Sequence, residues 1–215
     1  MAETLMSRDH ILHKVRTALG RQEGQAPASP PPVRLRAPEA TVEARIESLC
    51  RCVEALAGKT YRAASRDAAR DYVSGVIGAA GAVASNAPFL AECGITALAG
   101  VRSGLTDRLE LRGLCARMPF GITSADYALA DTGTLVMLAS RQEARLISLL
   151  PPVHLAVVPR ERILTSLDEL PMLQPLPVEE RSSMVLITGP SRTADIEQIL
   201  VRGVHGPGEV HVILV

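Results

Sequence analysis

The run VHVILV at residues 210–215 decides the fold class, because it is apolar at nearly successive positions rather than at alternate ones. Three more runs share this pattern: TLVML at 134–138, HLAVV at 154–158 and MVLIT at 184–188. Continuous apolar runs are typical of strands that are covered on both faces of a sheet. Helical patterns lie between several of them, including residues 145–150 and 193–200. Strands interleaved with helices predict a layered α/β fold with a mainly parallel sheet flanked by helices.

Weaker patterns earlier in the chain extend the same architecture. Apolar residues at steps of four, three, four and three from Val42 to Leu56 predict a helix. Ser65 is a good N-cap for a second helix. Further elements are expected as strands over 59–63, 82–85 and 95–99, and as a short helix that Asn86 caps over 86–92.

The first 39 residues are set apart from the α/β domain. Residues 1–20 are expected to contain a helix, which begins after the N-cap Ser7 and ends at Gly20. Residues 21–39 hold five of the 15 prolines and carry no periodic pattern, so we expect a Pro-rich linker. The α/β domain is then expected over residues 40–215.

Charge and composition exclude several classes of function. Lys and Arg together number 23, as do Asp and Glu, so the formal net charge is zero, whereas nucleic-acid-binding proteins usually carry a basic surplus. Aromatic residues make up 2% of the chain, too few for a base-stacking surface. No apolar run approaches the roughly 20 residues that span a bilayer, and the N-terminal segment lacks the apolar core of a secretory signal. We therefore expect a cytoplasmic protein with no membrane span and no nucleic-acid partner.

Cysteine spacing predicts no metal in this chain. The four cysteines are Cys50, Cys52, Cys93 and Cys115, and none of them forms a C-x-x-C pair. Zinc and iron–sulfur sites usually need such pairs. The Gly-rich fingerprints of dinucleotide and P-loop sites are also absent from the sequence. We expect no cofactor in this chain, and redox chemistry by this chain alone is disfavoured.

The segment GITSADYALADTGT at residues 121–134 is the first candidate site. Its Asp-Thr-Gly-Thr centre lies between two apolar arms and predicts a turn or hairpin over 127–138. Asp126 and Asp131 are candidate catalytic carboxylates. The candidate ligand-binding residues are Thr132, Gly133 and Thr134. Asp-Thr-Gly-Thr is also ordinary turn composition, so a purely turn-forming role is an equal alternative.

The second candidate site, TGPSRTADIE at residues 188–197, follows the apolar run MVLI. A strand, loop and helix in this order would place a helix N-terminus at the carboxyl end of a strand, where α/β folds bind ligands. The candidate ligand-binding residues are Gly189, Ser191, Thr193, Asp195 and Glu197. The two carboxylates would repel a phosphate, so hydroxyl groups or a cation fit better unless Arg192 contributes its charge. Capping of the helix is the alternative role.

The third candidate site is GVHGP at residues 203–207. Glycines on both sides of the Val-His pair let a tight loop project His205, a candidate catalytic residue that can take or give a proton near neutral pH. Gly206 is a candidate ligand-binding residue. His154 begins an apolar run and is expected to be a core histidine.

The three candidate loops are expected to converge on one cleft, because parallel sheets gather the loops that follow their strands at one edge. Together they would supply hydroxyl groups, backbone N–H groups and one imidazole. That set suits a small carboxylate ligand with a hydroxyl or keto group, with His205 as the proton-transfer group.

Three blocks of sequence carry a family resemblance. They are FGITSADYALADTGTLVMLAS from residue 120, LPPVHLAVVP from residue 150 and ITGPSRTADIEQILVRGVHGPGEVHVILV from residue 187. In this order they resemble the lactate utilization protein C family (LutC/YkgG), which consists of a LUD domain. The likeness is clear from residue 120 to residue 215 and looser back to about residue 41.

This resemblance implies a fold similar to ribose-5-phosphate isomerase, glucosamine-6-phosphate deaminase and the CoA transferases. It also implies a role, with two partner proteins that carry iron–sulfur clusters, in oxidising L-lactate to pyruvate. This chain would be the cluster-free subunit, which binds a small hydroxy or keto acid or docks the redox subunits. One alternative is a stand-alone enzyme on an isomerase or acyl-transferase-like scaffold, in which His205 acts with Asp126 or Asp131. Another is a regulatory binding module without catalysis.

Overall fold

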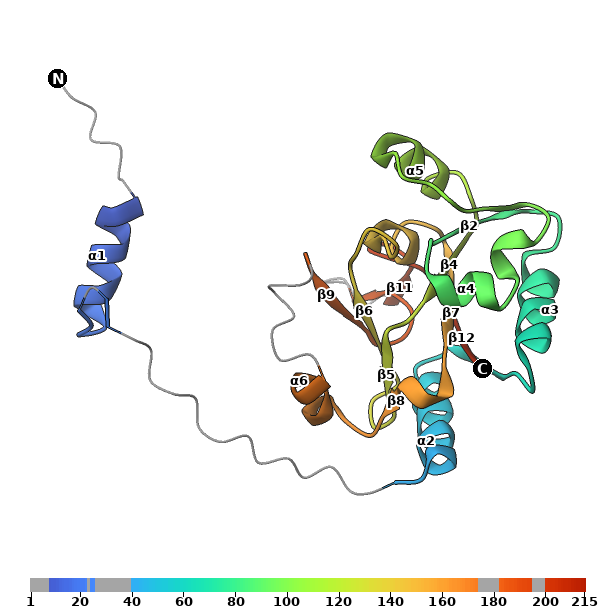
Figure 1. The fold of residues 1–215 in the computed structure, drawn as a ribbon, viewed down its shortest axis with the longest axis horizontal. Helices are drawn as coiled ribbons and strands as arrows, with labels where there is room; N and C mark the ends of the chain where they lie inside the picture. Colours follow the sequence, from blue (N-terminus) through green and yellow to red (C-terminus); the bar gives the residue numbers. More distant parts are fainter. Residues whose placement is uncertain (1–7, 23, 26–39, 174–181, 195–199) are drawn as a thin grey trace. The chain divides into compact units, whose positions relative to one another are not determined.

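The computed structural model describes residues 8–22, 24–25, 40–173, 182–194 and 200–215. The chain divides into two compact units, residues 1–34 and 35–215. The first unit contains helix α1 (Arg8–Ala18), none of whose described residues is buried (Figure 1). Its expected N-cap Ser7 and residues 26–39 of the expected linker lie outside the described residues. None of the described helices combines the length and apolarity that a membrane crossing requires.

A parallel sheet forms the centre of the second unit (Figure 1). Its described strands are β1 (Lys59–Arg62), β2 (Ala82–Ala84), β3 (Val101–Arg102), β4 (Phe120–Ser124), β7 (Val153–Val158) and β12 (Glu209–Leu214). They lie in the order β1-β12-β7-β4-β2-β3, and every neighbouring pair is parallel. The predicted α/β fold with a mainly parallel sheet flanked by helices is therefore confirmed.

Both faces of this sheet are covered, as the continuous apolar runs predict. On one face, Leu155 and Val157 of β7 pack in a core with residues of α3 (Arg66–Ile77) and α4 (Pro88–Glu92). On the other face, Ala156 and Val158 pack with α2 (Val42–Ala55) and a second sheet. The stagger of side chains along each strand thus sends alternate residues into two separate cores.

The two larger helices begin where the sequence predicts. The side chain of Thr41 accepts a hydrogen bond from the backbone N–H of Ala44 at the start of α2. Ser65 does the same for the N–H of Ala68 at the start of α3. Each cap satisfies one N–H group that the first turn of a helix leaves unpaired.

The second sheet contains the predicted hairpin and one run, 184–188, that was expected in the parallel sheet. Its described strands lie in the order β8 (Ile163–Leu164), β5 (Tyr127–Leu129), β6 (Thr134–Leu138) and β9 (Met184–Ile187). The predicted hairpin over 127–138 is confirmed, because β5 and β6 are antiparallel and joined by the Asp-Thr-Gly-Thr turn. The assignment of 184–188 to the parallel sheet is wrong, whereas 134–138 was expected in the hairpin and is found there. The hairpin reverses the chain, and β6 then pairs antiparallel with β9.

The expected helix over 193–200 is also wrong in its described part. Residues Arg192–Ala194 form strand β10, which pairs antiparallel with β11 (Leu200–Arg202). Ser191 and Thr193 therefore cap no helix in the described residues, and Asp195 and Glu197 lie outside them. Tertiary pairing has overridden the capping chemistry of the local sequence.

Two expectations in the first half of the domain also change. Residues expected as a strand over 95–99 contain the 3₁₀ helix η1 (Ile95–Ala97), and the strand β3 follows it. Asn86 does not cap α4, whose N-cap is Ala87. The amide of Asn86 instead bonds the backbone N–H of Gly104 and the carbonyl of Leu105, so it fixes a neighbouring loop.

Short helical elements complete the second unit. They are α5 (Arg108–Cys115), η2 (Arg145–Ser148), η3 (Arg160–Arg162), η4 (Leu167–Glu169) and α6 (Leu170–Leu173). The helical pattern over 145–150 is thus realised as one 3₁₀ turn, η2, directly before β7.

Candidate functional site

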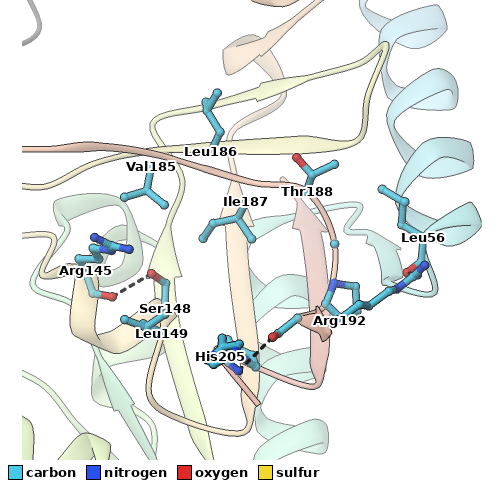
Figure 2. Close-up of a pocket in the computed structure, with 15 residues that line it drawn as sticks. Leu56, Arg145, Ser148, Leu149, Val185, Leu186, Ile187, Thr188, Arg192 and His205 are labelled. Atoms are coloured by element: carbon cyan, nitrogen blue, oxygen red, sulfur yellow. Dashed lines mark hydrogen bonds between the residues drawn. The ribbon is translucent and has the colours of Figure 1, made fainter. Parts of the chain in front are cut away.

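A pocket of about 430 Å³ lies at the amino ends of β7 and β12 (Figure 2). Ser148 and Leu149 precede β7, and Gly206 and Pro207 precede β12, so both approaches to these strands line it. The third wall is β9 with the loop that follows it. We name this cavity the His205 pocket, after the histidine that lines it.

Two of the three candidate loops are joined by hydrogen bonds in this pocket. The backbone N–H of Ser191 donates to the carbonyl of Pro207 at 2.8 Å, and its carbonyl accepts from the N–H of Gly203 at 3.1 Å. The Oγ of Ser191 accepts from the backbone N–H of His205 at 3.3 Å (Figure 2). These bonds hold the exposed imidazole of His205 beside the loop of residues 189–191.

Gly189 lets this loop pass close to the end of α2. Its φ is +78°, a conformation that favours glycine, and an added Cβ would lie 3.0 Å from the Cβ of Leu56. The guanidinium group of Arg192 donates to the carbonyl of Leu56, the C-cap of α2. A cation at a helix C-terminus satisfies a carbonyl that has no partner within the helix.

The floor of the pocket is apolar and its charged groups are basic. Figure 2 shows Val185 and Ile187 on the side of β9 turned toward Leu149 and His205. The ionisable groups among the described lining residues are Arg145, Arg192 and His205, and no carboxylate is among them. Hydroxyl groups of Thr188, Ser148 and Ser191 complete the lining. Such a pocket suits a small anion that also carries a hydroxyl or keto oxygen.

Among the described residues, one hydrogen bond connects the Asp-Thr-Gly-Thr turn to a residue that lines the pocket. Thr134 Oγ1 lies 2.8 Å from Thr132 Oγ1 and 2.9 Å from Thr188 Oγ1, and of these three only Thr188 is among the described lining residues. Gly133 has a φ of +70°, and an added Cβ would lie 2.8 Å from the backbone nitrogen of Val53. The turn is therefore packed against α2, and glycine is needed there for that close approach.

The two candidate aspartates do not join His205. Asp131 is exposed, and its backbone groups bond Thr165 and the thiol of Cys52. The carboxylate of Asp126 accepts from the backbone N–H of Leu138 at 2.7 Å and lines a different cavity. The structure does not bring His205 and Asp126 into one cavity, because the two residues line separate ones.

Arg145 and Ser148 were missed by sequence reasoning. Both belong to η2, and Ser148 is buried with its hydroxyl donating to the carbonyl of Arg145 at 3.0 Å (Figure 2). No motif surrounds them, and the only available signal is their position just before the apolar run of β7.

His154 lies in the core, as expected. Its side chain is fully buried, and its Nε2 is 2.7 Å from the hydroxyl of Thr123. Burial, with a smaller effect of the charge on His211, lowers the pKa of His154 to about 4, so the ring is neutral at physiological pH. No group of three His, Cys, Asp or Glu side chains suited to a metal ion occurs within the described residues.

A family model of the LUD domain matches residues 46–215. The chain belongs to the LUD domain family. This confirms the resemblance drawn from the blocks that begin at residues 120, 150 and 187, and the matched range contains every strand of the parallel sheet.

Curated relatives of this LUD domain are named lactate utilization protein C. The protein from Exiguobacterium is 39% identical over 108 residues, which cover 48% of this chain and 47% of the relative. The protein from Bacillus subtilis is 40% identical over 99 residues, which cover 44% and 41% of the two chains. The chain is thus matched over about half the length of these relatives.

A solved structure supports the fold of the LUD domain. It is the crystal structure of a DUF162 family protein from Deinococcus radiodurans, which is 18% identical in sequence and aligns with a TM-score of 0.63. The alignment covers 82% of this chain and 99% of that one.

Proposed function

We propose that this LUD domain acts in the oxidation of L-lactate to pyruvate in the cytoplasm, as the subunit that carries no iron–sulfur cluster. It binds the small hydroxy or keto acid in the His205 pocket. The observation that carries the proposal is the charge of that pocket, where two arginines and a histidine meet no carboxylate among the described lining residues. The names of the relatives, lactate utilization protein C, support the choice of lactate and pyruvate.

Different lining residues contact different parts of the ligand in this proposal. Arg145 and Arg192 attract the carboxylate of the ligand, and charge-assisted bonds of this kind are stronger than neutral ones. The hydroxyl groups of Ser191 and Thr188 bond the oxygen on C2. The apolar side chains of Val185 and Ile187 accommodate the methyl group.

His205 is the proton-transfer group of this proposal. Oxidation of lactate breaks the O–H and C2–H bonds and releases two protons and two electrons. The imidazole accepts the hydroxyl proton, as a histidine can near neutral pH. The proton from C2 would pass to solvent water, and the two electrons would pass one at a time to the iron–sulfur clusters of the partner subunits, because a protein side chain in its ordinary state offers no acceptor for them.

Calorimetric titration of the purified chain with pyruvate tests the binding step. We expect saturable binding by the unaltered chain and at least about ten-fold weaker binding by His205→Ala, because the pocket loses the imidazole that bonds the ligand. The matched control is His13→Ala, which removes an exposed histidine of α1. Equal affinities of the two variants would contradict the role of His205.

Reconstitution tests the place of this chain in the reaction. The chain, combined with purified iron–sulfur subunits of a lactate utilization system, should form pyruvate from L-lactate with an added electron acceptor, and omission of the chain should abolish product. Oxidation of lactate by this chain alone would favour the stand-alone enzyme. Pyruvate binding without any effect on the reconstituted reaction would favour the regulatory module.

A further inference from the structure

A second cavity, of about 490 Å³, lies at the carboxyl ends of β2, β4 and β7. Ala87 follows β2, Ser124 ends β4 and Pro159 follows β7, and all three line it. We name it the Glu143 pocket, after the glutamate described next. None of the described residues that line the His205 pocket also lines this second cavity.

The chain changes direction at this point of the sheet. From β2 it continues to β3 on one side, and it then returns to β4 on the other side of β2. Neighbouring strands whose connections run in opposite directions leave a crevice at their carboxyl ends, which is where open α/β sheets bind ligands. The Glu143 pocket includes residues from both sides of this crevice.

Glu143 bridges the ends of the two strands. Its Oε2 accepts a hydrogen bond from the hydroxyl of Ser85, just after β2, at 2.7 Å, and from the backbone N–H of Ser124, at the end of β4, at 3.3 Å. The backbone N–H of Glu143 donates to Ser140 Oγ at 2.9 Å, which fixes the loop that carries it. These bonds hold one carboxyl oxygen, Oε2, in place between the two strand ends.

The second oxygen of Glu143 has no such partner. The residue is only 6% exposed, and its Oε1 is buried without a hydrogen-bond partner among the described residues. Burial, with a smaller effect of the Asp126 charge, raises the pKa of Glu143 to about 8, so the carboxyl group is neutral at physiological pH. Because Oε2 accepts two hydrogen bonds, the proton resides on Oε1. The buried oxygen is therefore a donor that needs an acceptor.

The charges around Glu143 define the ligand class. Arg66 is paired with Glu92 at 3.0 Å, and Arg162 stacks on the ring of Tyr127. The charged side chains that line the pocket, besides Glu143, are Arg66, Arg162, Glu92, Asp126 and Glu161. Carboxylates thus outnumber arginines, which disfavours an anion. A cation with donors only is disfavoured as well, because it cannot accept the bond from Oε1.

We propose that the Glu143 pocket binds a small uncharged hydroxylated compound, an oxygen of which accepts a hydrogen bond from the buried carboxyl group of Glu143. The carboxylates of Asp126 and Glu161 accept hydrogen bonds from the hydroxyl groups of that ligand. Ligand pockets of several hundred Å³ commonly combine a few such polar groups with apolar walls. Phe89, Pro88 and Pro159 supply the apolar walls here.

Titration calorimetry with dihydroxyacetone as the probe tests this assignment, with D-glycerate and ethanolamine as its anionic and cationic counterparts. At pH 6 the wild type should bind dihydroxyacetone more tightly than either counterpart. At pH 9 its affinity should be about ten-fold lower, because only about a tenth of Glu143 is then protonated. Tighter binding of D-glycerate or ethanolamine, or no saturable binding of dihydroxyacetone, would overturn the proposal.

Two variants separate the hydrogen bond from the fold. Glu143→Gln keeps an acceptor for Ser85 and Ser124 and places an NH₂ donor where Oε1 lies, so it should bind dihydroxyacetone equally at pH 6 and pH 9. Glu143→Ala should not bind it at either pH. The same loss of affinity at pH 9 in wild type and Glu143→Gln would show that another group titrates and would overturn the role of Glu143. The measurement uses no lactate and no partner subunit, so it stands apart from the test of the His205 pocket.

Discussion

The two ends of the parallel sheet offer a ligand different chemistry. At the amino ends of β7 and β12, the described charged groups of the His205 pocket are all basic. At the carboxyl ends of β2, β4 and β7, the Glu143 pocket is lined by more carboxyl groups than arginines. The same sheet therefore presents a surface suited to an anion at one edge and a surface suited to an uncharged ligand at the other.

The two pockets also differ in the kind of group that holds each of them together. In the His205 pocket, backbone groups of Ser191, Gly203 and Pro207 bind one another, and the imidazole stays exposed. In the Glu143 pocket, one buried side chain joins the ends of two strands. A site made of loops depends on turn residues, whereas a site made at strand ends depends on the burial of a polar group.

The largest effect is expected at Gly121, in β4, because it packs against the element that supplies Arg145 and Ser148 to the His205 pocket. An added Cβ would lie 2.0 Å from the carbonyl oxygen of Ile147, so η2 would have to move. We expect Gly121→Ala to lower the free energy of unfolding by about 4 kcal/mol or more, as a severe overpacking does. Urea denaturation of the wild type and the variant measures this change in the free energy of unfolding.

Gly75→Ala is the matched control. Gly75 lies inside α3, and an added Cβ would meet nothing within 4 Å. Alanine at such a helical position should raise the free energy of unfolding by about 0.5–1 kcal/mol. Similar midpoints for the two variants would mean that β4 and η2 are not in close contact at Gly121.

A change in the pH dependence of stability is expected for Glu143→Gln. The pKa of Glu143 is raised by burial from 4.5 to about 8 on folding. Between these values the folded protein holds one more proton than the unfolded chain, so its free energy of unfolding falls as pH rises. The loss from about pH 5 to about pH 8 is about 3 kcal/mol, and the variant, which cannot titrate there, should lack it.

His154 acts in the opposite direction in this measurement. Its pKa is lowered by burial to about 4, so it reduces stability as pH falls below about 6.5. Because His154 is present in both proteins, the difference between wild type and Glu143→Gln at each pH cancels its contribution. Parallel pH profiles of the two proteins would show that Glu143 is ionised in the folded state.

Arg145→Gln tests the basic character of the His205 pocket. The variant keeps a hydrogen-bonding side chain on η2 but removes one of the charges that face a bound carboxylate. We expect pyruvate affinity to fall about ten-fold, the usual effect of losing one charge-assisted bond. Arg108→Gln, at an exposed position of α5, should change it little. An equal loss of pyruvate affinity in both variants would show that the loss depends on the net charge of the protein and not on the position of Arg145 in the pocket.

Hydropathy patterns and helix-capping residues in the sequence predicted much of the fold. The spacing from Val42 to Leu56 predicted α2, Ser65 predicted the start of α3, and the continuous runs predicted β7 and β12. The same rule placed 184–188 in the wrong sheet. Met184 and Leu186 are 42% and 45% exposed, so β9 has an outer face that is apolar as well, and its sequence resembles a strand covered on both faces.

The candidate site was only partly accessible to sequence reasoning. The loops of Gly189 and His205 carry glycines, which mark tight turns, and these loops do meet in one pocket. Glu143 lies in a loop of ordinary polar composition, and its burial results from Ser85 and Ser124, which are 58 and 19 residues away in the chain. No local pattern encodes such a contact, because it exists only after β2 and β4 are side by side.

The smallest effects are expected for two hydroxyl substitutions, which test whether the Asp-Thr-Gly-Thr turn only supports the His205 pocket or takes part in binding. Thr134 is 4% exposed, and its hydroxyl bonds those of Thr132 and Thr188. Thr134→Val keeps the shape of the side chain and removes both bonds, so it should lower the free energy of unfolding by about 1 kcal/mol. Pyruvate affinity should stay within about two-fold, because Thr188 is exposed and can bond water instead.

Ser191→Ala is the companion change in the His205 pocket. It removes a lining hydroxyl and the acceptor for the backbone N–H of His205, so pyruvate affinity should fall about five-fold. Calorimetry with pyruvate on the two variants then shows which of the two loops contributes more to pyruvate affinity. If Thr134→Val weakened pyruvate binding as much as Ser191→Ala, the Asp-Thr-Gly-Thr turn would be part of the binding site, and its packing against α2 would serve to position it for the ligand.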